Sequence, residues 1–272
     1  MKIENSRYEN ELETAFRAGK EAGEVIDKFA ENGFETDDKE DGSKITEADR
    51  KAQEKVVEVI SDCFPEDGFL GEEENLSPSG EDRVWVIDPI DGTFNFDHGF
   101  SHFCVSIALK VEGETVLGVV YSPESSVDDT YLAVKGEGAY RTSEGIEEAE
   151  SISVSEQSEI EDSIFFLSCF DIFEGELEAE LNSLEELAED GAVHRQLGSC
   201  ALEMCRVASG EADFHVVPVV KEWDYAAAGL IVEEAGGEVR KRDSKFPDCT
   251  EVVSSNGLLQ ERVEETVSDS FV

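Results

Sequence analysis

An apolar run that ends in closely spaced acids constrains this chain more than any other feature. Residues 85–96 read WVIDPIDGTFNF. The run from Val84 to Ile87 predicts a buried strand that delivers Asp88 at its end. Pro89 then stiffens the backbone and removes a hydrogen-bond donor, so we expect Asp91 to be held near Asp88.

The glycine and threonine that follow suit a phosphate group. Gly92 allows the main chain to approach an anion closely, and Thr93 is expected to open a short helix whose free N–H groups face a phosphate. The alternative is a strand-to-turn exit in which aspartate serves only turn formation. That alternative explains one aspartate, but not two acids together with proline, glycine and threonine. The segment therefore predicts a metal-bound phosphate site.

Two other segments carry acids that we expect at the same site. In GEEE at 71–74, the glycine turns the chain so that Glu72 points back toward the first strand's end, whereas Glu74 is expected to be solvated. Asp224 opens a predicted helix that stops at the glycine pair 236–237. An ordinary N-cap role would explain Asp224 alone. Its combination with the other two segments favours a metal ligand.

These motifs resemble those of a known enzyme family. GEEE, WVIDPIDGTFNF and WDYAAAGLIVEEAGG, in this order, resemble the signature set of the inositol monophosphatase family of metal-dependent, lithium-sensitive phosphatases. Segments 41–43, 46–49 and 198–199 also fall where that family places its blocks. The resemblance implies a layered αβαβα sandwich of the inositol monophosphatase and fructose-1,6-bisphosphatase type. It also implies a site between two halves of the chain and a homodimer.

The resemblance further implies roles for individual residues. It places two to three Mg²⁺ ions per site on Glu72, Asp88, Asp91, Asp224 and the backbone carbonyl of Ile90. Asp49 and Thr93 would form the pair that orients the attacking water, with Glu72 as a further catalytic residue. A small phosphorylated substrate is expected to meet residues from several segments: Asp91, Gly92, Thr93, Arg195, Gly198, Ser199 and Asp224.

The chemistry of magnesium agrees with those roles. Mg²⁺ prefers octahedral oxygen ligands and keeps several waters, so carboxylates from separate segments suit it. Two ions can clamp one phosphate, which predicts in-line hydrolysis without a phosphoenzyme. Thr93, with its proton accepted by Asp49, can take a hydrogen bond from the water and aim its lone pair at phosphorus. Thr46 and Asp49 also fit a capping box on a helix over 48–62, and both interpretations are compatible.

Composition bounds the cellular setting. No stretch approaches the roughly 18 apolar residues of a membrane span, and the charged start MKIENSRYENELE lacks an apolar signal core. We therefore expect a cytoplasmic protein with no membrane partner. Six cysteines without a CxxC pair are interpreted as reduced thiols rather than a disulfide framework or a zinc site. They are Cys63, Cys104, Cys169, Cys200, Cys205 and Cys249.

The charge of the chain is extreme. It has 66 acidic and 22 basic residues, a formal net charge of −44, whereas a magnitude of about 2 to 8 suits a small soluble domain. Self-repulsion of this size destabilises a compact state in dilute buffer, and molar salt screens it. We infer a halophilic, archaeal-type protein. Nucleic acid is not expected as a partner, since no basic stripe is present to neutralise phosphates.

The hydrophobic pattern divides the chain into two halves, 1–145 and 146–272. The first is expected to be an α+β unit, and the second alternates strands and helices as a layered α/β unit does. The first helix is predicted over 6–30, with a capping box between Ser6 and Glu9. Later helices are predicted over 48–62, 175–190, 201–208, from 224, and 258–267. Strands are predicted over 103–111, 116–121, 130–134, 163–167, 212–217 and 252–253.

Substrate choice is the point at which the sequence discriminates least. The family resemblance covers inositol monophosphatases, archaeal-type fructose-1,6-bisphosphatases, histidinol-phosphate phosphatases and adenosine bisphosphate nucleotidases. We favour small sugar or polyol phosphates, because Asn95 and Phe96 resemble the inositol and sugar phosphatase branch. Val217 stands where an inositol-specific enzyme would offer an acid, which opposes strict inositol recognition. Arg195 and Lys221 are the cations placed to meet a second phosphate, although Arg195 fits a structural salt bridge equally well. The alternative of another class is a catalytically silent, acidic cation-binding scaffold.

Overall fold

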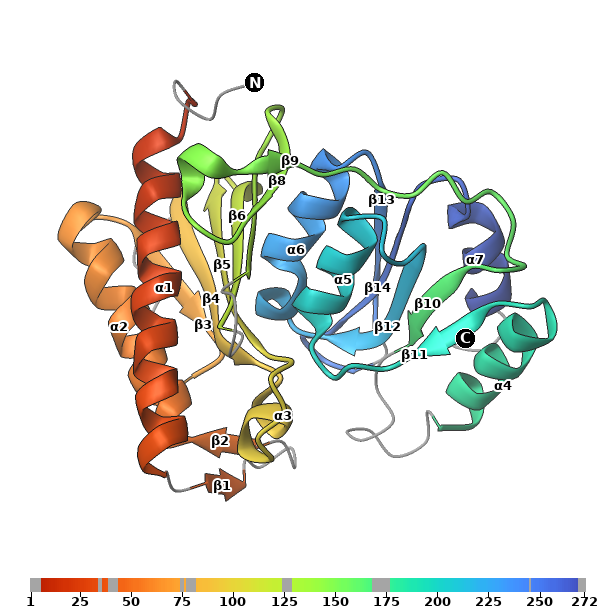
Figure 1. The fold of residues 1–272 in the computed structure, drawn as a ribbon, viewed down its shortest axis with the longest axis horizontal. Helices are drawn as coiled ribbons and strands as arrows, with labels where there is room; N and C mark the ends of the chain where they lie inside the picture. The colour runs from red at the N-terminus through yellow and green to blue at the C-terminus, as the bar shows by residue number, and fades with distance from the viewer. Residues whose placement is uncertain are drawn as a thin grey trace.

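Two large β-sheets, a small two-stranded sheet and the helices around them make up the described part of the structure, a computed structural model (Figure 1). It describes residues 6–33, 36–38, 44–73, 76, 82–123, 129–167, 177–244 and 246–268. The family block at 41–43, Glu74 and Cys169 lie outside the described residues. A short antiparallel hairpin of β1 (Thr36–Asp38) and β2 (Lys44–Thr46) precedes the main sheets.

A seven-stranded sheet carries the acid-rich segment. Its order is β3-β4-β5-β6-β7-β8-β9, and its neighbours are antiparallel except for the parallel pair β3 and β4. The strands predicted over 103–111, 116–121 and 130–134 are confirmed, and they form an antiparallel meander that β8 and β9 continue. The strands are β3 (Gly68–Gly71), β4 (Arg83–Asp91), β5 (Cys104–Val111), β6 (Glu114–Ser122), β7 (Asp129–Val134), β8 (Gly138–Thr142) and β9 (Glu150–Ser151).

Two long helices cover one face of this sheet. α1 (Glu9–Asn32) lies against β5 and β6, and α2 (Glu47–Cys63) lies against α1 and β4 (Figure 1). Apolar side chains on their inner faces are buried, including Leu12 and Ile26 of α1 and Val56 of α2. Burial of such an amphipathic face supplies most of the stability of a helix in a folded protein.

The start of α1 differs from the prediction. The helix begins at Glu9 with Tyr8 at the N-cap, and no side chain caps it. The predicted capping box of Ser6 and Glu9 is wrong, because the Ser6 hydroxyl instead accepts a hydrogen bond from the Tyr8 N–H at 3.1 Å. Ser6 lies too far ahead of the helix to reach its first turn.

A five-stranded mixed sheet forms the second half of the molecule. Its order is β11-β10-β12-β14-β13, with β10 parallel to β11 and β12, and β14 antiparallel to β12 and β13. The strands are β10 (Ile164–Leu167), β11 (Val193–Arg195), β12 (Phe214–Val220), β13 (Glu238–Asp243) and β14 (Thr250–Ser255). α4 (Leu177–Glu189) and α7 (Gln260–Ser268) flank this sheet, α4 at β11 and α7 at β14.

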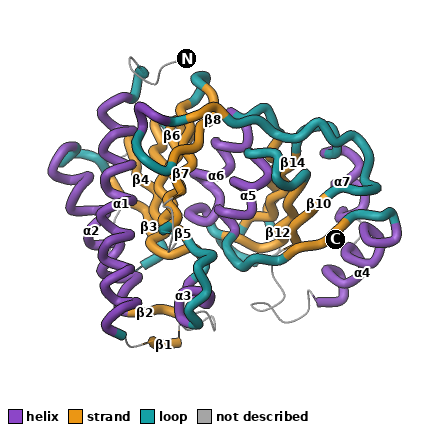
Figure 2. The backbone as a smooth tube through the Cα atoms, viewed as in Figure 1, coloured by secondary structure: helices purple, strands orange, loops and turns teal. Residues whose placement is uncertain are grey.

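The two sheets are joined through a central layer of two helices. α5 (Cys200–Ala208) and α6 (Glu222–Glu234) lie between the sheets, and α6 contacts strands of both (Figures 1 and 2). Gly118 of β6 permits this close approach, since a Cβ there would lie 2.6 Å from the carbonyl oxygen of Ala227. The predicted αβαβα layering is confirmed.

The chain passes from one sheet to the other after β9. The 3-10 turn η1 (Ile146–Glu148) precedes β9, which still pairs with β8 in the first sheet, so the crossing follows Ser151. The division into halves at 145 and 146 remains a prediction about domains. No helix among the described residues is long and apolar enough to cross a membrane. The five cysteines that the structure describes are free thiols, as expected.

Candidate active site

The segment with two aspartates lies in the interior of the first sheet. β4 does not end at Asp88 as predicted but runs through Asp91, and the pairing register with β5 shifts between the two residues. Pro89, which has no N–H to give to a ladder, lies at this irregularity. Asp88 and Asp91 are only 2% and 8% exposed, so the irregularity holds two acids in a buried place.

Gly92 makes the sharp turn that follows. Its φ of 98° is in the left-handed region, and a Cβ there would lie 3.0 Å from the carbonyl oxygen of His102 and 3.1 Å from that of Gly198. Glycine is therefore required on both conformational and steric grounds. α3 (Thr93–Asp97) begins at the next residue, which confirms the predicted short helix.

The predicted pair of Asp49 and Thr93 is present. The Thr93 hydroxyl lies 3.0 Å from Asp49 Oδ1 and 3.0 Å from the carbonyl oxygen of Ile90, with one proton to donate. The other oxygen of Asp49 accepts hydrogen bonds from the backbone N–H and the hydroxyl of Thr46, at 2.7 and 2.5 Å. Asp49 thus closes the predicted capping box of α2 and reaches the active-site threonine as well.

Burial changes the acidity of Asp49. The side chain is fully buried, and desolvation raises its pKa to about 6, against the lowering effect of its hydrogen bonds with Thr46 and Thr93. The charge of Glu72 raises the pKa further. A carboxyl group with this pKa can exchange a proton near neutral pH, as a general acid or base must.

Glu72 stands at the edge of β3, beside the acids of β4. Its backbone N–H donates to the Ile87 carbonyl oxygen at 3.2 Å, so the chain turns here beside β4 as predicted. Its charge raises the pKa of Asp49, Asp88 and Asp224 alike, which places its side chain among all three.

Asp224 completes the group from the central layer. It lies in the first turn of α6, and its Oδ2 accepts the backbone N–H of Lys221 at 2.7 Å. Burial raises its pKa well above the ordinary value, and the charges of Asp91 and Glu72 raise it further. α6 begins at Glu222 with Lys221 at the N-cap, so Asp224 is not the N-cap residue, and its hydrogen bond from Lys221 exists together with proximity to the other acids.

The α5 N-terminus supplies the donors that hold Asp91. The carboxylate accepts hydrogen bonds from the Ser199 hydroxyl at 2.6 Å, the Cys200 N–H at 3.1 Å and the Ala201 N–H at 2.7 Å. Burial raises the pKa of Asp91 to about 6, although these donors lower it. Because the helix dipole favours negative charge at this end, α5 stabilises an acid from the opposite sheet.

The site offers a set of hard oxygen donors that suits Mg²⁺. It consists of the Ile90 carbonyl and the four clustered acids, which are Glu72, Asp88, Asp91 and Asp224. Burial raises the pKa of Asp88 well above its ordinary value, and the charges of Glu72, Asp91 and Asp224 add to that rise. A bound divalent cation would offset this repulsion. Within the described ranges, no group of three or more His, Cys, Asp or Glu side chains already stands in metal-ligating geometry. The fit to magnesium therefore rests on the donor chemistry and the shared charge of the acids.

Comparison with known proteins decides the family. The sequence model described as the inositol monophosphatase family matches residues 7–270. The chain belongs to this family. Members of the family are phosphatases that act on small phosphorylated substrates and are generally magnesium-dependent. The chain is thus a phosphoric monoester hydrolase with the fold of its relatives.

Two relatives and one solved structure show the range of similarity. The "Fructose-1,6-bisphosphatase/inositol-1-monophosphatase" of Thermotoga maritima is 35% identical over 227 residues, 83% of this chain and 82% of that protein. The "Nus factor SuhB" of Pasteurella multocida is 36% identical over 232 residues, 84% of each chain. The solved structure of a Thermotoga maritima IMPase superimposes with a TM-score of 0.83 at 30% identity, covering 96% of this chain and 98% of that one.

The remaining predicted substrate residues lie at different distances from the acids of this phosphatase. Gly198 and Ser199 lie directly beside Gly92 and Asp91. Arg195 is exposed on β11, the edge strand of the second sheet, and its guanidinium donates to the neighbouring His194 carbonyl oxygen at 2.8 Å. Among the described residues, no hydrogen bond or ion pair joins Arg195 to the acids, so its substrate role stays a prediction.

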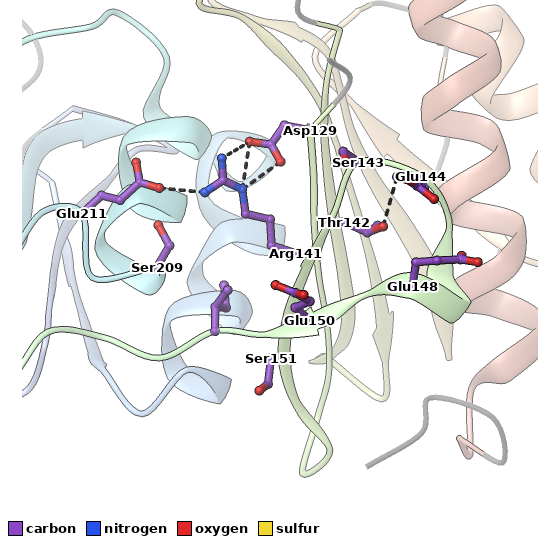
Figure 3. A pocket seen from close by; sticks show the side chains of 11 residues that line it. Asp129, Arg141, Thr142, Ser143, Glu144, Glu148, Glu150, Ser151, Ser209 and Glu211 are labelled. Carbon is purple, nitrogen blue, oxygen red and sulfur yellow. Dashed lines mark hydrogen bonds and ion pairs between the residues drawn. The ribbon is translucent and has the colours of Figure 1, made fainter.

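A separate cavity of about 730 Å³ lies where β8 and β9 meet the end of α5 (Figure 3). Arg141 extends across it and donates to Asp129 at 2.8 Å and to Glu211 at 2.7 Å. None of the clustered acids lines this cavity, so it is distinct from the candidate active site. Its lining residues are Asp129, Arg141, Thr142, Ser143, Glu144, Glu148, Glu150, Ser151, Ile152, Ser209 and Glu211.

Several residues that shape the site were missed in the sequence. Asn95 donates to the carbonyl oxygens of His102 and Leu197, each at 2.7 Å, and so joins α3 to the turn before α5. The side-chain amide of Gln53 bonds both the N–H and the C=O of Glu73, at 3.1 and 3.2 Å. These amides give no local pattern in the sequence, because the Glu73 partner of Gln53 lies 20 residues away and the Leu197 partner of Asn95 lies 102 residues away.

Proposed function

We propose that this phosphatase hydrolyses small sugar and polyol phosphates, with inositol 1-phosphate and fructose 1,6-bisphosphate as the first candidates. One observation carries the proposal: the acids of three separate segments converge beside a threonine whose hydroxyl is bonded to a buried aspartate. The charge of Glu72 raises the pKa of Asp88 and the pKa of Asp224, and Thr93 lies 3.0 Å from Asp49. A silent cation-binding scaffold would need the acids but not the threonine and aspartate pair.

The proposed ligands for Mg²⁺ are Glu72, Asp88, Asp91, Asp224 and the Ile90 carbonyl. Magnesium, when bound, supplies positive charge to the phosphate oxygens and lowers the pKa of water. α5 orients Asp91 through three donors, and Lys221 orients Asp224 through its backbone N–H. Fixed carboxylates of this kind keep the reacting groups in line without reorganisation during the reaction.

Thr93 and Asp49 are proposed to control the proton of the attacking water. Asp49 accepts the Thr93 proton, so that the Thr93 oxygen is left as an acceptor for a water proton. The water oxygen then presents a lone pair to phosphorus. Water attacks phosphorus, the bond from phosphorus to the ester oxygen breaks, and the departing oxygen takes up a proton that balances the one lost by the water. The alcohol and inorganic phosphate are then released. The raised pKa of Asp49, about 6, suits a group that shares a proton during this step.

Val217 of β12, in the second sheet, is an argument against strict recognition of inositol. Val217, at the position where an acid would meet sugar hydroxyls, is 1% exposed and belongs to the apolar cluster around α5 and α6. A site without that acid loses a hydrogen-bonding group that selects one polyol over another. We therefore propose a broad sugar phosphatase, in line with a relative whose name combines two substrates.

A second phosphate group, as in fructose 1,6-bisphosphate, needs a cation near the acids. Lys221 is better placed than Arg195, because it precedes α6 and its charge lowers the pKa of Asp224. Its ammonium group donates to the Asp248 carbonyl oxygen at 3.2 Å. The proposal assigns the second phosphate to Lys221, and Lys221→Ala should then raise KM for the bisphosphate far more than KM for inositol 1-phosphate.

The test is phosphate release in molar KCl with Mg²⁺ from four substrates: inositol 1-phosphate, fructose 1,6-bisphosphate, histidinol phosphate and adenosine 3',5'-bisphosphate. Comparable kcat/KM for the first two, with little release from the others, is the expected result. A clear preference for histidinol phosphate or the nucleotide would overturn the substrate class. Absence of release from all four, with Mg²⁺ still bound, would favour the silent scaffold.

A homodimer, a halophilic origin and a cytoplasmic location remain predictions, as does the absence of a nucleic-acid partner. The last needs a direct test, because one relative is named as a Nus factor. A formal charge of −44 opposes contact with a phosphate backbone. Fluorescence anisotropy with labelled RNA should show no binding at any salt concentration in which the protein is folded, and saturable binding would contradict the expectation.

A further inference from the structure

The turn before α5 is held by a buried acid that takes no part in the proposed reaction. Glu203 is 0% exposed, and its Oε1 accepts hydrogen bonds from the N–H groups of Leu197 and Gly198, at 2.6 and 3.1 Å. Hydrogen bonds from two consecutive peptide groups to one charged oxygen are strong and directional. Glu203 therefore fixes the position of the turn from inside the central layer.

A histidine of the second sheet holds Glu203 in turn. His215 of β12 is 0% exposed, and its Nε2 lies 3.2 Å from Glu203 Oε2. The ring of His215 meets Phe166 edge-on, with ring centroids 6.2 Å apart. Leu197 packs against the cluster that contains Phe166, so the same wall contacts both the turn and the histidine. The pair thus links the second sheet to the turn.

The opposite side of the turn is held by α3. Asn95 donates to the carbonyl oxygen of Leu197 at 2.7 Å, while Glu203 receives the N–H of the same residue. Gly198 has a φ of 81°, and a Cβ there would lie 3.1 Å from the Asn95 amide. The turn is therefore held from both halves of the molecule.

This turn determines where the α5 donors lie. Ser199, Cys200 and Ala201 follow it directly and donate to Asp91 at 2.6, 3.1 and 2.7 Å. A rotation of the turn would move all three donors together. The chain of contacts therefore runs from His215 through Glu203 and the turn to Asp91, with each step shorter than 3.3 Å.

We propose that Glu203 and His215 are positioning residues for the magnesium site. They hold the Leu197–Gly198 turn so that α5 presents its three donors to Asp91 and orients that carboxylate toward the metal. The inference rests on the proposed role of Asp91 as a ligand. Groups that orient metal ligands in this way typically change metal affinity by about 10- to 100-fold when they are removed.

A carboxylate is well suited to this position. Its two oxygens both accept, one from the two backbone N–H groups and one facing the histidine ring. An amide would turn a donor toward one of these partners. Glu203→Gln, which keeps the volume of the side chain, should therefore weaken the arrangement less than Glu203→Ala, which removes it.

The experiment is calorimetric titration of MgCl₂ into the folded full-length protein in molar KCl, which needs no activity. Glu203→Ala is expected to weaken Mg²⁺ binding about 10- to 100-fold, with Glu203→Gln and His215→Phe weakened less. The matched control is Glu264→Ala, because Glu264 is 8% exposed and accepts hydrogen bonds from Arg240, Arg242 and Gln260, which lie outside the turn. It should lose thermal stability while keeping the wild-type Mg²⁺ affinity.

Each outcome separates this inference from the proposed function. Wild-type Mg²⁺ affinity in Glu203→Ala, or equal weakening in Glu264→Ala, would overturn the positioning role. A wild-type protein that binds no Mg²⁺ would overturn both the positioning role and the proposed magnesium ligands. Protein that binds Mg²⁺ but releases no phosphate would refute the proposed function alone. Should Glu203→Ala fail to fold, the comparison of Glu203→Gln with Glu264→Gln decides, and equal affinities would contradict the proposal.

Discussion

Replacement of Gly118 by alanine should damage the active site from a distance. Gly118 lies on β6, and a Cβ there would meet three backbone atoms of Ala227 in α6, at 2.6, 3.0 and 3.1 Å. Ordinary contact between such atoms begins near about 3.4 Å. Because backbone cannot rotate away as a side chain can, α6 must move by up to about 0.8 Å. Asp224 lies three residues before Ala227 on the same helix.

The expected magnitudes follow from this geometry. Overpacking of a close contact costs about 1 to 3 kcal/mol of unfolding free energy. A misplacement approaching 1 Å lowers activity by up to about 100-fold, so kcat should fall about 10- to 100-fold. We would measure urea unfolding in molar KCl and phosphate release at saturating substrate. The sheet and helix should remain folded, since the loss is a fraction of a typical domain stability.

Gly229→Ala is the matched control on the same helix. A Cβ at Gly229 would lie 3.8 Å from Met204 and 3.9 Å from Val239, both ordinary contacts. Alanine is favoured over glycine in a helix by about 1 kcal/mol, so this variant should be more stable and fully active. Wild-type stability and activity in Gly118→Ala would refute the reasoning, as would an equal loss of activity in Gly229→Ala.

Three further predictions test other parts of the structure. Thr93→Ala should lower kcat by about 10²- to 10⁴-fold with Mg²⁺ affinity retained, and Thr93→Ser should restore much of it, measured by phosphate release. Transfer from molar KCl to dilute buffer should unfold the protein, seen by circular dichroism, and unchanged stability would contradict the high-salt inference. The raised pKa of Asp49 means that the folded state binds its proton more tightly than the unfolded state. In Mg²⁺-free protein, Asp49 should therefore contribute a loss of up to about 3 kcal/mol of stability as pH rises from 4 through 6, and Asp49→Asn should remove that share of the slope while the share of Asp91 remains.

Sequence patterns predicted those elements that are determined by interactions between residues close together in the chain. The α2 capping box needs only Thr46 and Asp49, three residues apart, and the structure contains it. The short helix at Thr93 follows from Gly92, whose φ of 98° the turn requires. Amphipathic helices and apolar strands such as β6 are specified by their own periodicity.

Two strands with polar faces were missed, because they carry no hydrophobic periodicity. β13 (Glu238–Asp243) is mostly exposed and reads EVRKRD, so it has no apolar alternation to detect. As an edge strand it pairs only with β14, and its charges are tied to neighbours such as Glu264. β11 is a three-residue edge strand with a similar lack of pattern. The tertiary context defines both strands.

The sequence allowed the acids of the candidate site to be predicted, but not the hydrogen-bond donors that orient them. Asp88, Asp91 and Gly92 form one short motif, and Glu72 and Asp224 each end or begin a predictable element. The donors that α5 gives to Asp91 come from residues 108 to 110 positions later. Such contacts depend on how two sheets and a helix layer are placed together, which no single-segment pattern contains.

The central claim is that the clustered acids hold the Mg²⁺ ions that drive phosphate ester hydrolysis. We would measure phosphate release from inositol 1-phosphate and fructose 1,6-bisphosphate against Mg²⁺ concentration in molar KCl, for wild type and Asp88→Asn. Saturable Mg²⁺-dependent release by wild type, abolished in a folded Asp88→Asn, is the predicted result. Release that needs no Mg²⁺, or that persists in Asp88→Asn, would contradict the account.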